Sequence, residues 1–448
     1  MNKKGNPRPS RIGGRVRQSL RNSFIDGAFA SAMIGFTEQY ITPFALALKA
    51  TSAQIGMLAA FPSLISSLIQ LKSADVTEHL KSRIRFITIF VFFHAFMYIP
   101  ILLVPFIFKE NQVLWLILFV TLMASFNAFP GPAWTSLMAD HIPSKSRGTY
   151  FGWRNRLLGT ITVASAFLAG FILNLFGKNN LTGFVVILSL ACVARFISWS
   201  FLKKMYEPHM KITKEHYFTF WEFIRRVKES NFAKFVLYVA SISFAVSMSG
   251  PFFAVYMLRD LNFSYVTYMI ISIAATTSTL LAMGIWGKHA DIVGNMRVIR
   301  LTSLFVPLAP IFWLFSHNIV YLILIQFFAG FIWAGYNLSV FNFVYDAVMP
   351  EKRTRCVSYF NVINGCAICI GSLTGGFLAK NLPTVFGYKL LTLFLLSGIL
   401  RAIFVASILP LIKEVRRVEK ISSLDLFFSV TRLRPIEVEG GKLLKPKF

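Results

Sequence analysis

The chain has 448 residues, of which 55% are hydrophobic and only 15% are charged, whereas an average soluble domain has roughly 25% charged residues. This excludes an ordinary soluble globular protein, because the apolar surface exceeds what such a fold buries, and the excess has to face lipid. The formal net charge of +27 favours either nucleic acid or an anionic membrane surface as a partner.

Twelve apolar segments follow one another, each near the ~20 residues that a helix needs to cross a bilayer. We expect these spans at residues 21–48, 52–71, 84–108, 112–139, 149–175, 182–202, 232–258, 264–286, 297–316, 318–348, 355–379 and 386–412. A basic tail (1–20) precedes them, and a second basic tail (413–448) follows them. The charged linker 203–231 contains WEFIRRVKES, which predicts a short helix on the inner surface. The fold class is therefore an all-α integral membrane protein.

The positions of the basic residues decide between the two partners. With the N-terminus inside, 38 of the 46 Lys and Arg residues lie in inner segments, six lie in outer loops, and Arg195 and Arg401 lie within spans. This bias follows the positive-inside rule and predicts that both termini are cytoplasmic. We therefore expect a multi-pass protein of the cell membrane, or of the inner membrane in a bacterium, that contacts anionic lipid and no nucleic acid.

The two halves of the sequence repeat each other. A shift of 206 residues superimposes rare polar residues, namely Asp140 on Asp346, Arg147 on Arg353, Asn155 on Asn361 and Arg195 on Arg401. Such matches predict two parallel six-helix bundles, 21–202 and 232–412. We expect the aligned acids and arginines to pair between helices, with Arg154 and Arg156 as the favoured partners of Asp140.

Two short charged loops, LKSADVTEHLKSR (71–83) and GKHADIVGNMR (287–297), occupy corresponding places in the halves. Together with the span count, they resemble the major facilitator superfamily (MFS) of secondary transporters, whose loop has Gly, Asp, Gly and basic residues at fixed spacing. The second loop matches at Gly287, Asp291, Gly294 and Arg297; the first keeps Asp75 and Arg83 but has Leu71 and Glu78 at the glycine positions. Gly permits a positive φ, and Asp can cap a helix and pair with Arg, so these residues are the predicted cytoplasmic gate.

The resemblance implies a secondary active transporter that moves a small organic solute by alternating access, coupled to protons or to another ion. A non-transporting sensor or scaffold of the same fold is the alternative function, and amphipathic, drug-like solutes are the alternative substrate class. We find no GxxxxGK[ST] loop, nucleophile motif or His/Glu metal spacing, so we expect no enzyme activity, cofactor or metal site. We expect a monomer.

In this superfamily, helices 1, 4, 7 and 10 wall the central cavity, and the corresponding spans of this chain carry small and polar side chains. Span one places Gly27, Ser31, Gly35, Glu38 and Thr42 at helical spacing on one face. The candidates for substrate binding on these four spans are Gln39, Asn127, Trp134, Ser247, Gln326, Trp333 and Asn337.

Glu38 is a carboxylate well inside an apolar span, where an ionised group costs at least ~2.5 kcal/mol. A buried carboxyl group can exchange a proton near neutral pH, which makes Glu38 the first candidate for proton coupling. The alternative is a structural hydrogen bond to a neighbouring helix. Asp26, near the inner end of the span, is either the second coupling candidate or a helix cap. We expect Arg195 and Arg401 to extend to the interface, and His94 to be packed without a partner.

Overall fold

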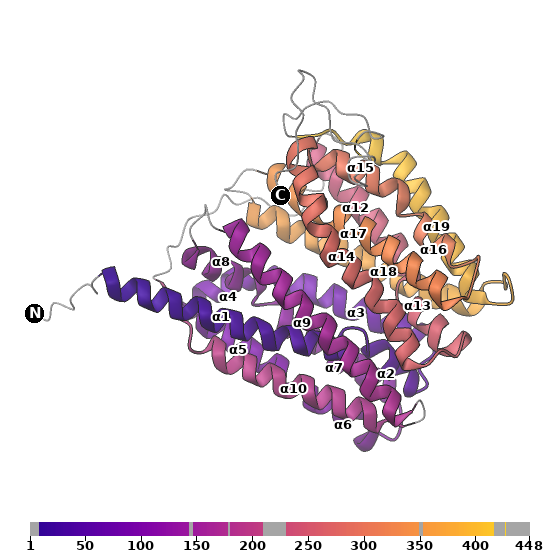
Figure 1. The fold of residues 1–448 in the computed structure, drawn as a ribbon, viewed down its shortest axis with the longest axis horizontal. Helices are drawn as coiled ribbons and strands as arrows, with labels where there is room; N and C mark the ends of the chain where they lie inside the picture. Colours follow the sequence, from indigo (N-terminus) through magenta and orange to yellow (C-terminus); the bar gives the residue numbers. More distant parts are fainter. Residues whose placement is uncertain are drawn as a thin grey trace, which may run out of the picture. The chain divides into compact units, whose positions relative to one another are not determined.

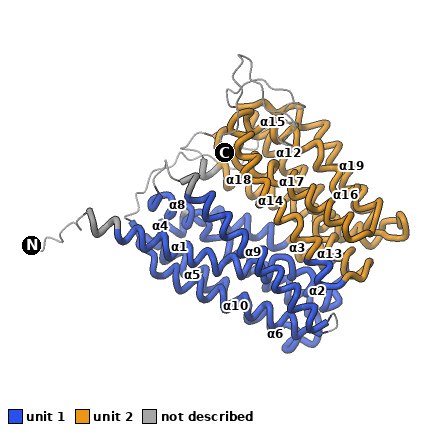
Figure 2. The backbone as a smooth tube through the Cα atoms, in the orientation of Figure 1, with its two compact units in different colours: residues 1–54, 61–214, 264–269 blue, residues 55–60, 215–263, 270–448 orange. Residues whose placement is uncertain are grey.

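The computed structural model describes residues 9–142, 147–177, 180–208, 230–348, 353–415 and 426. These residues form helices and one isolated β-bridge, between Val385 and Tyr388. The chain divides into two compact units, coloured separately in Figure 2. Unit 1 comprises residues 1–54, 61–214 and 264–269, and unit 2 comprises residues 55–60, 215–263 and 270–448. The short helix predicted for the linker lies outside the described residues.

The helices of the first half belong to unit 1, except that the middle of α3 is assigned to unit 2 (Figure 1). They are α1 (Pro9–Thr37), α2 (Ile41–Ala47), α3 (Ser52–Gln70), α4 (Ser73–Leu80), α5 (Arg83–Phe96), α6 (Tyr98–Ile107), α7 (Gln112–Ala128), α8 (Gly131–His141), α9 (Arg147–Phe176) and α10 (Thr182–Leu202). The first helix therefore begins at Pro9, ahead of the expected span, so that part of the predicted basic tail is helical.

The helices of the second half belong to unit 2, apart from the first residues of α14, which join unit 1. They are α12 (Asn231–Ser249), α13 (Phe252–Val255), the π-helical turn η3 (Tyr256–Asp260), α14 (Tyr265–Val293), α15 (Asn295–Phe305), α16 (Leu308–Phe312), α17 (Ile319–Asp346), α18 (Arg353–Asn381), α19 (Lys389–Ser407) and the 3₁₀ turn η5 (Leu409–Leu411).

Ten helical segments in the described part of the chain are long and apolar enough to cross a membrane. They coincide with ten of the predicted spans. The other two predicted spans coincide with the pair α1–α2, which has a break at residues 38–40, and the pair α15–α16, which has a break at Val306 and Pro307. Twelve crossings remain the prediction, and both additional ones would be interrupted helices.

Proline explains most of the interruptions. Pro130, Pro251 and Pro307 lie at the junctions α7–α8, α12–α13 and α15–α16. A proline inside a helix lacks the backbone N–H and collides with the preceding turn, so the helix breaks or bends there. The predicted spans are thus correct in place, but several of them consist of two helices.

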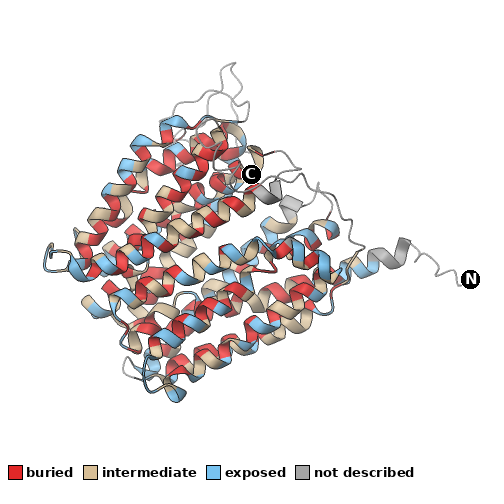
Figure 3. Ribbon diagram, turned by 180° about the vertical axis from the view of Figure 1, so that it is seen from behind, coloured by how far each residue is buried: buried red, intermediate tan, exposed pale blue. Residues whose placement is uncertain are grey.

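Exposed residues are spread along the helices (Figure 3), and in both units they include large apolar residues. Leu175, Leu281 and Phe377 are each more than 60% exposed. In water such surfaces would promote aggregation, whereas in a bilayer they contact acyl chains at no cost. The burial pattern therefore supports the assignment of these helices to the membrane.

The row of small residues on α1 packs against α9. A side chain at Gly27 would collide with Arg154 and Leu158, and one at Gly35 would collide with the backbone of Thr162. Small residues allow this close approach of two helices, which replaces the missing hydrophobic force in lipid. The prediction that the whole stripe faces a cavity was therefore wrong for Gly27 and Gly35, and α1 ends at Thr37, before Glu38 and Thr42.

In unit 2 the corresponding close packing joins α12 and α18. Here the glycines lie on the later helix, since a side chain at Gly371 or Gly375 would collide with the backbone of Phe244 or Met248. Around this contact, buried residues of α12, α15, α17, α18 and α19 form one core, which includes Phe235, Ile299 and Phe343.

Candidate functional site

Arg195 of α10 lies at the centre of a buried polar network in unit 1. Its side chain donates from Nε to His94 Nδ1 (3.0 Å), from Nη1 to Ser198 Oγ (3.2 Å) and from Nη2 to Asn127 Oδ1 (3.1 Å). The fifth member is Asp26 of α1, whose Oδ1 accepts a hydrogen bond from Ser198 Oγ (2.6 Å). We call these five residues the Asp26–Arg195 network.

The Asp26–Arg195 network joins four helices, and its charged residues are buried. Asp26 is 5% exposed and Arg195 is 6% exposed, while Asn127 is an exposed member. The residues come from α1, α5, α7 and α10. A charged guanidinium far from water needs a counter-charge and full hydrogen bonding, and Asp26 supplies the charge through Ser198.

Two sequence predictions for this region were wrong, and a third was confirmed in part. Arg195 does not extend to an interface, because it is almost fully buried and its guanidinium donates to His94, Ser198 and Asn127. His94 is packed as expected but has a partner, since it accepts from Arg195. Asp26 does not cap a helix, because α1 begins at Pro9 and places Asp26 in its interior.

Arg154 of α9 lies on the same part of α1. It donates to the backbone oxygen of Ser23 (3.1 Å), and its guanidinium carbon lies 5.1 Å from the centroid of the Trp134 ring. Both Arg154 and Arg195 interact electrostatically with Asp26. The predicted substrate residues Asn127 and Trp134 therefore each contact an arginine that neighbours Asp26.

Glu38 lies in the turn between α1 and α2, and it is exposed. Its side chain forms no hydrogen bond or ion pair with any residue in the described ranges. The alternative of a structural Glu tied to a neighbouring helix therefore has no support. The adjacent Gln39 accepts a hydrogen bond through its backbone oxygen from the hydroxyl of Tyr268 (2.7 Å).

A second charged cluster of unit 1 surrounds Arg83 at the start of α5. Arg83 Nη1 lies 2.7 Å from Asp140 Oδ2, and Nε lies 3.5 Å from Glu207 Oε1. Glu207 also accepts from the backbone N–H of Arg83 (2.6 Å) and from Ser82 Oγ (2.5 Å). Asp140 therefore pairs with Arg83 and not with Arg154, because the Arg154 side chain is directed at α1. The side chains of Arg147 and Arg353 lie outside the described residues.

The predicted gate loops differ in detail from the expected geometry. Asp75 pairs only with exposed Lys72 (3.3 Å) and stays away from Arg83. Asp291 is exposed and lies in the last turn of α14, so it cannot cap the next helix. Glu414 takes that role and accepts from the backbone N–H of Met296 (2.8 Å).

Glycine is used as predicted at one position of this loop. Gly294 has φ +88° directly before α15, a conformation that side chains disfavour, whereas Gly287 lies within helix α14. Asp346 accepts from Asn295 Nδ2 (2.7 Å), so this predicted pairing residue does connect two helices. The partner of the matching Arg297 is not among the contacts above.

The polar candidates of unit 2 form no comparable network. Trp333 is half-buried and packs edge-on against Tyr336 (5.3 Å), and Asn337 is exposed on the next turn of α17. Ser247 and Gln326 are half-buried on α12 and α17. Trp333 and Asn337 lie one turn apart on α17, and no contact joins two members of this group among the described residues.

Arg401 is the counterpart of Arg195 in unit 2, and it too was wrongly expected at the interface. It is 3% exposed and donates to Ser249 Oγ (2.9 Å) and to the backbone oxygen of Val306 (3.3 Å). Its Nε has no partner among the described residues.

Sequence reasoning missed Ser198, Glu207 and Glu414. A signal for the two glutamates was present, since each follows the intramembrane arginine of its half by a nearly equal number of residues, from Arg195 to Glu207 and from Arg401 to Glu414. Ser198 carried no signal, because a serine in an apolar helix usually bonds to its own backbone.

Comparison with known proteins gives relatives in sequence and in structure. The family model described as Major Facilitator Superfamily matches residues 235–436. The multi-drug resistance efflux pump PmrA of Streptococcus pneumoniae is 25% identical over 283 residues, which cover 62% of this chain and 68% of that protein. Its homolog in Lactococcus lactis is 22% identical over 273 residues, covering 60% and 66%.

Among solved structures, the nucleoside transporter NupG matches with a TM-score of 0.70 at 13% identity, covering 88% of this chain and 100% of that one. A D-xylose-proton symporter matches with a TM-score of 0.68 at 12% identity, covering 90% and 99%. The fold, the charged loops and the sequence relatives agree. They support a multi-pass membrane transporter of the MFS type, and the family model matches the second half of this chain.

Proposed function

We propose that the chain is a proton-coupled secondary transporter that carries an amphipathic organic solute by alternating access. The match to the family model supports transport, and alternating access is the mechanism by which such two-bundle proteins work. The uneven distribution of basic residues supports an orientation with both termini in the cytoplasm.

Two features support an amphipathic solute. The relatives described above are named multi-drug resistance efflux pumps. The predicted substrate residues also include indole rings, one under Arg154 at Trp134 and one beside Tyr336 at Trp333. Aromatic faces bind apolar bodies, and their polar edges orient a charged or hydrogen-bonding end, so such surfaces suit molecules with both characters.

The observation that carries the coupling proposal is the isolation of Glu38. Asp26 accepts a hydrogen bond from Ser198 and lies beside two arginines, so its carboxyl group is held within a fixed network. Glu38 has no such partner, and it lies in a helix break of the first span. A carboxylate that is free of fixed charges can bind and release a proton as its surroundings change. We therefore assign the coupling proton to Glu38 and a structural role to Asp26.

The test uses Glu38→Gln, which removes the titration and nearly preserves the shape. Purified protein is placed in liposomes, and transport of ethidium, a lipophilic fluorescent cation, is followed with and without a pH gradient. We expect accumulation driven by the gradient to fail, while exchange of dye between two equal pools continues, because exchange moves no net proton. Glu110→Gln, which neutralises an exposed loop carboxylate, is the matched control and should behave as wild type.

Two outcomes would contradict the proposal. Full gradient-driven accumulation by Glu38→Gln would exclude Glu38 and leave Asp26 as the remaining candidate. A wild-type protein that moves neither ethidium nor a panel of neutral and cationic dyes would contradict the amphipathic substrate class.

A further inference from the structure

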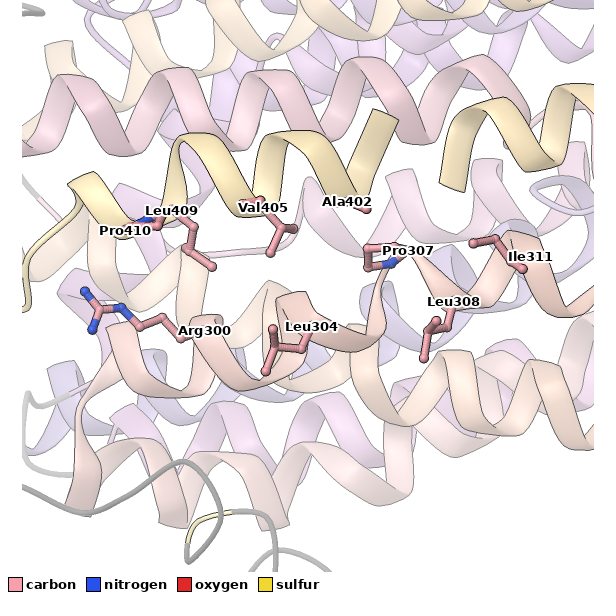
Figure 4. A pocket seen from close by; sticks show the side chains of 10 residues that line it. Arg300, Leu304, Pro307, Leu308, Ile311, Ala402, Val405, Leu409 and Pro410 are labelled. Atoms are coloured by element: carbon pink, nitrogen blue, oxygen red, sulfur yellow. The ribbon is translucent and has the colours of Figure 1, made fainter. Parts of the chain in front are cut away.

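A cavity of about 670 Å³ lies within unit 2, between the pair α15–α16 and α19 (Figure 4). Its walls are aliphatic side chains and prolines, among them Leu304, Pro307 and Ile311 on one side and Ala402 and Leu409 on the other. None of the four spans expected to wall the substrate cavity contributes to it. The groove is therefore a separate feature of the transporter.

The shape of the groove follows from the local sequence. Pro307 interrupts the helix, so the backbone of α15 and that of α16 do not form one continuous ridge. Opposite it, Ala402 and Ala406 are spaced four residues apart and leave a shallow strip along α19. Leu304 is 58% exposed beside this strip, which shows that the groove opens at the outside of unit 2.

Arg300 closes one end of the groove, and Figure 4 shows its guanidinium at the end of the row of apolar side chains. Arg300 is exposed, and its Nη2 donates to the backbone oxygen of Ile412 (2.7 Å). Its other guanidinium nitrogens have no hydrogen-bond partner in the described part of the chain. One contact thus fixes the side chain, and the remaining donors are available to an anion.

The dimensions of the groove match one leaflet of a bilayer. From Arg300 to Ile311 the two helices together rise by at most about 16 Å, at 1.5 Å per residue. One leaflet contributes about 15 Å of hydrocarbon, half of the ~30 Å core. A molecule whose charged end meets Arg300 would therefore extend an apolar tail of one leaflet's depth along the groove.

We propose that this groove binds an anionic phospholipid, with the phosphate at Arg300 and one acyl chain between α15–α16 and α19. A guanidinium recognises phosphate oxygens with paired hydrogen bonds, and aliphatic walls suit an acyl chain. A small soluble anion would leave the apolar length of the groove unfilled. A purely apolar solute would leave the donors of Arg300 unused.

The test is native mass spectrometry of the full-length protein, released from detergent micelles that contain phosphatidylglycerol or phosphatidylcholine with identical acyl chains. We expect wild type to retain phosphatidylglycerol preferentially. Arg300→Gln should weaken that retention about fivefold, the ratio that corresponds to ~1 kcal/mol for one basic residue at an anionic lipid. Ala402→Phe should fill the groove and reduce binding of the lipid regardless of its headgroup.

Arg85→Gln is the matched control, because Arg85 is an exposed arginine in the first turn of α5, the corresponding helix of the first half. It should retain phosphatidylglycerol like wild type. Thermal unfolding in lipid-free detergent checks that Arg300→Gln and Ala402→Phe are folded, and Ala406→Phe replaces Ala402→Phe if the latter is not. Equal retention of the two lipids, or no effect of Arg300→Gln, would overturn the proposal. So would a dimer that dissociates on Ala402→Phe, since a second copy would then occupy the groove.

Discussion

Arg195 and Arg401 occupy equivalent positions in the two halves, yet their surroundings differ in one decisive way. Arg195 reaches the carboxylate of Asp26 through Ser198 and has an acceptor for each part of its guanidinium. Arg401 has only a serine hydroxyl and a backbone oxygen. Both are almost fully buried. The same residue in a repeated fold is therefore compensated in unit 1, whereas in unit 2 no counter-charge contacts it among the described residues.

The two halves therefore share their close helix packing but differ in the interactions of their buried charged residues. Close helix packing occurs in both units, between α1 and α9 and between α12 and α18. The network of acid, arginine and histidine occurs in unit 1, where both intramembrane carboxylates of the first span also lie. Substitutions in the two units test this contrast.

The largest effect is expected from Arg195→Met. It would leave Asp26 buried beside Arg154 alone, and it would remove the donors to His94 and Asn127. Removing one partner from a buried charged pair costs about 3 kcal/mol or more. The free energy of unfolding in detergent, measured by denaturant titration, should fall by that amount.

The double variant Asp26→Asn with Arg195→Met provides the control. If the two residues act as one charge-balanced unit, the double variant is destabilised by less than the sum of the single variants. Strict additivity would show that Asp26 and Arg195 do not interact, and the contrast between the units would fail.

A smaller effect is expected where the two predicted gate loops turn. Gly294 precedes α15 with φ +88° and ψ 155°, while Lys81 ends α4 with φ 51°. The Gly294 conformation is accessible essentially to glycine alone, so Gly294→Ala should destabilise the protein by about 2 kcal/mol. The left-handed conformation of Lys81 is less costly for a side chain than that of Gly294. Lys81→Gly should therefore stabilise the protein by less than ~1 kcal/mol, because the relief of backbone strain is offset by the greater conformational freedom of glycine in the unfolded chain.

Thermal unfolding of both variants in the same detergent measures this pair of effects. A harmless Gly294→Ala would mean that the second loop does not require its glycine, and the family signature there would have no backbone explanation. A stabilisation by Lys81→Gly as large as the loss from Gly294→Ala would show that the first loop is equally strained.

An effect of opposite sign to that of Arg195→Met is expected from Arg401→Met. It removes a buried charge that has no counter-ion among the described residues, and Ser249 keeps Ser397 as a hydrogen-bond partner at 2.9 Å. Replacing such a group with an apolar side chain of similar length should stabilise unit 2 by about 1 kcal/mol. Arg195→Met, the identical replacement in unit 1, is the comparison. A loss of stability similar to that of Arg195→Met would require a counter-charge for Arg401 and would abolish the contrast.

The sequence by itself determined the class of fold, most of the helix positions and the family. These depend on long apolar runs and on the distribution of basic residues, and both act over whole segments, so that a single residue changes little. The same signals located the first-span carboxylates and the glycine before α15. They could not say which side chains meet, because residues such as Asp26 and Ser198 lie far apart in the chain.

Tertiary structure decided the roles of individual polar residues. Arg195 could either extend to the interface or remain inside, and the acceptors on α5, α7 and α10 decided that it remains inside. Asp140 could pair with several arginines. The Arg154 side chain is directed at α1, and Asp140 pairs with Arg83. In the sequence, Gly27 and Gly35 fit a row of residues facing a cavity as well as a row that packs against a helix. In the structure, α9 packs against that face. In each case helical spacing fixes which residues share a face, and only the neighbouring helices fix what that face contacts.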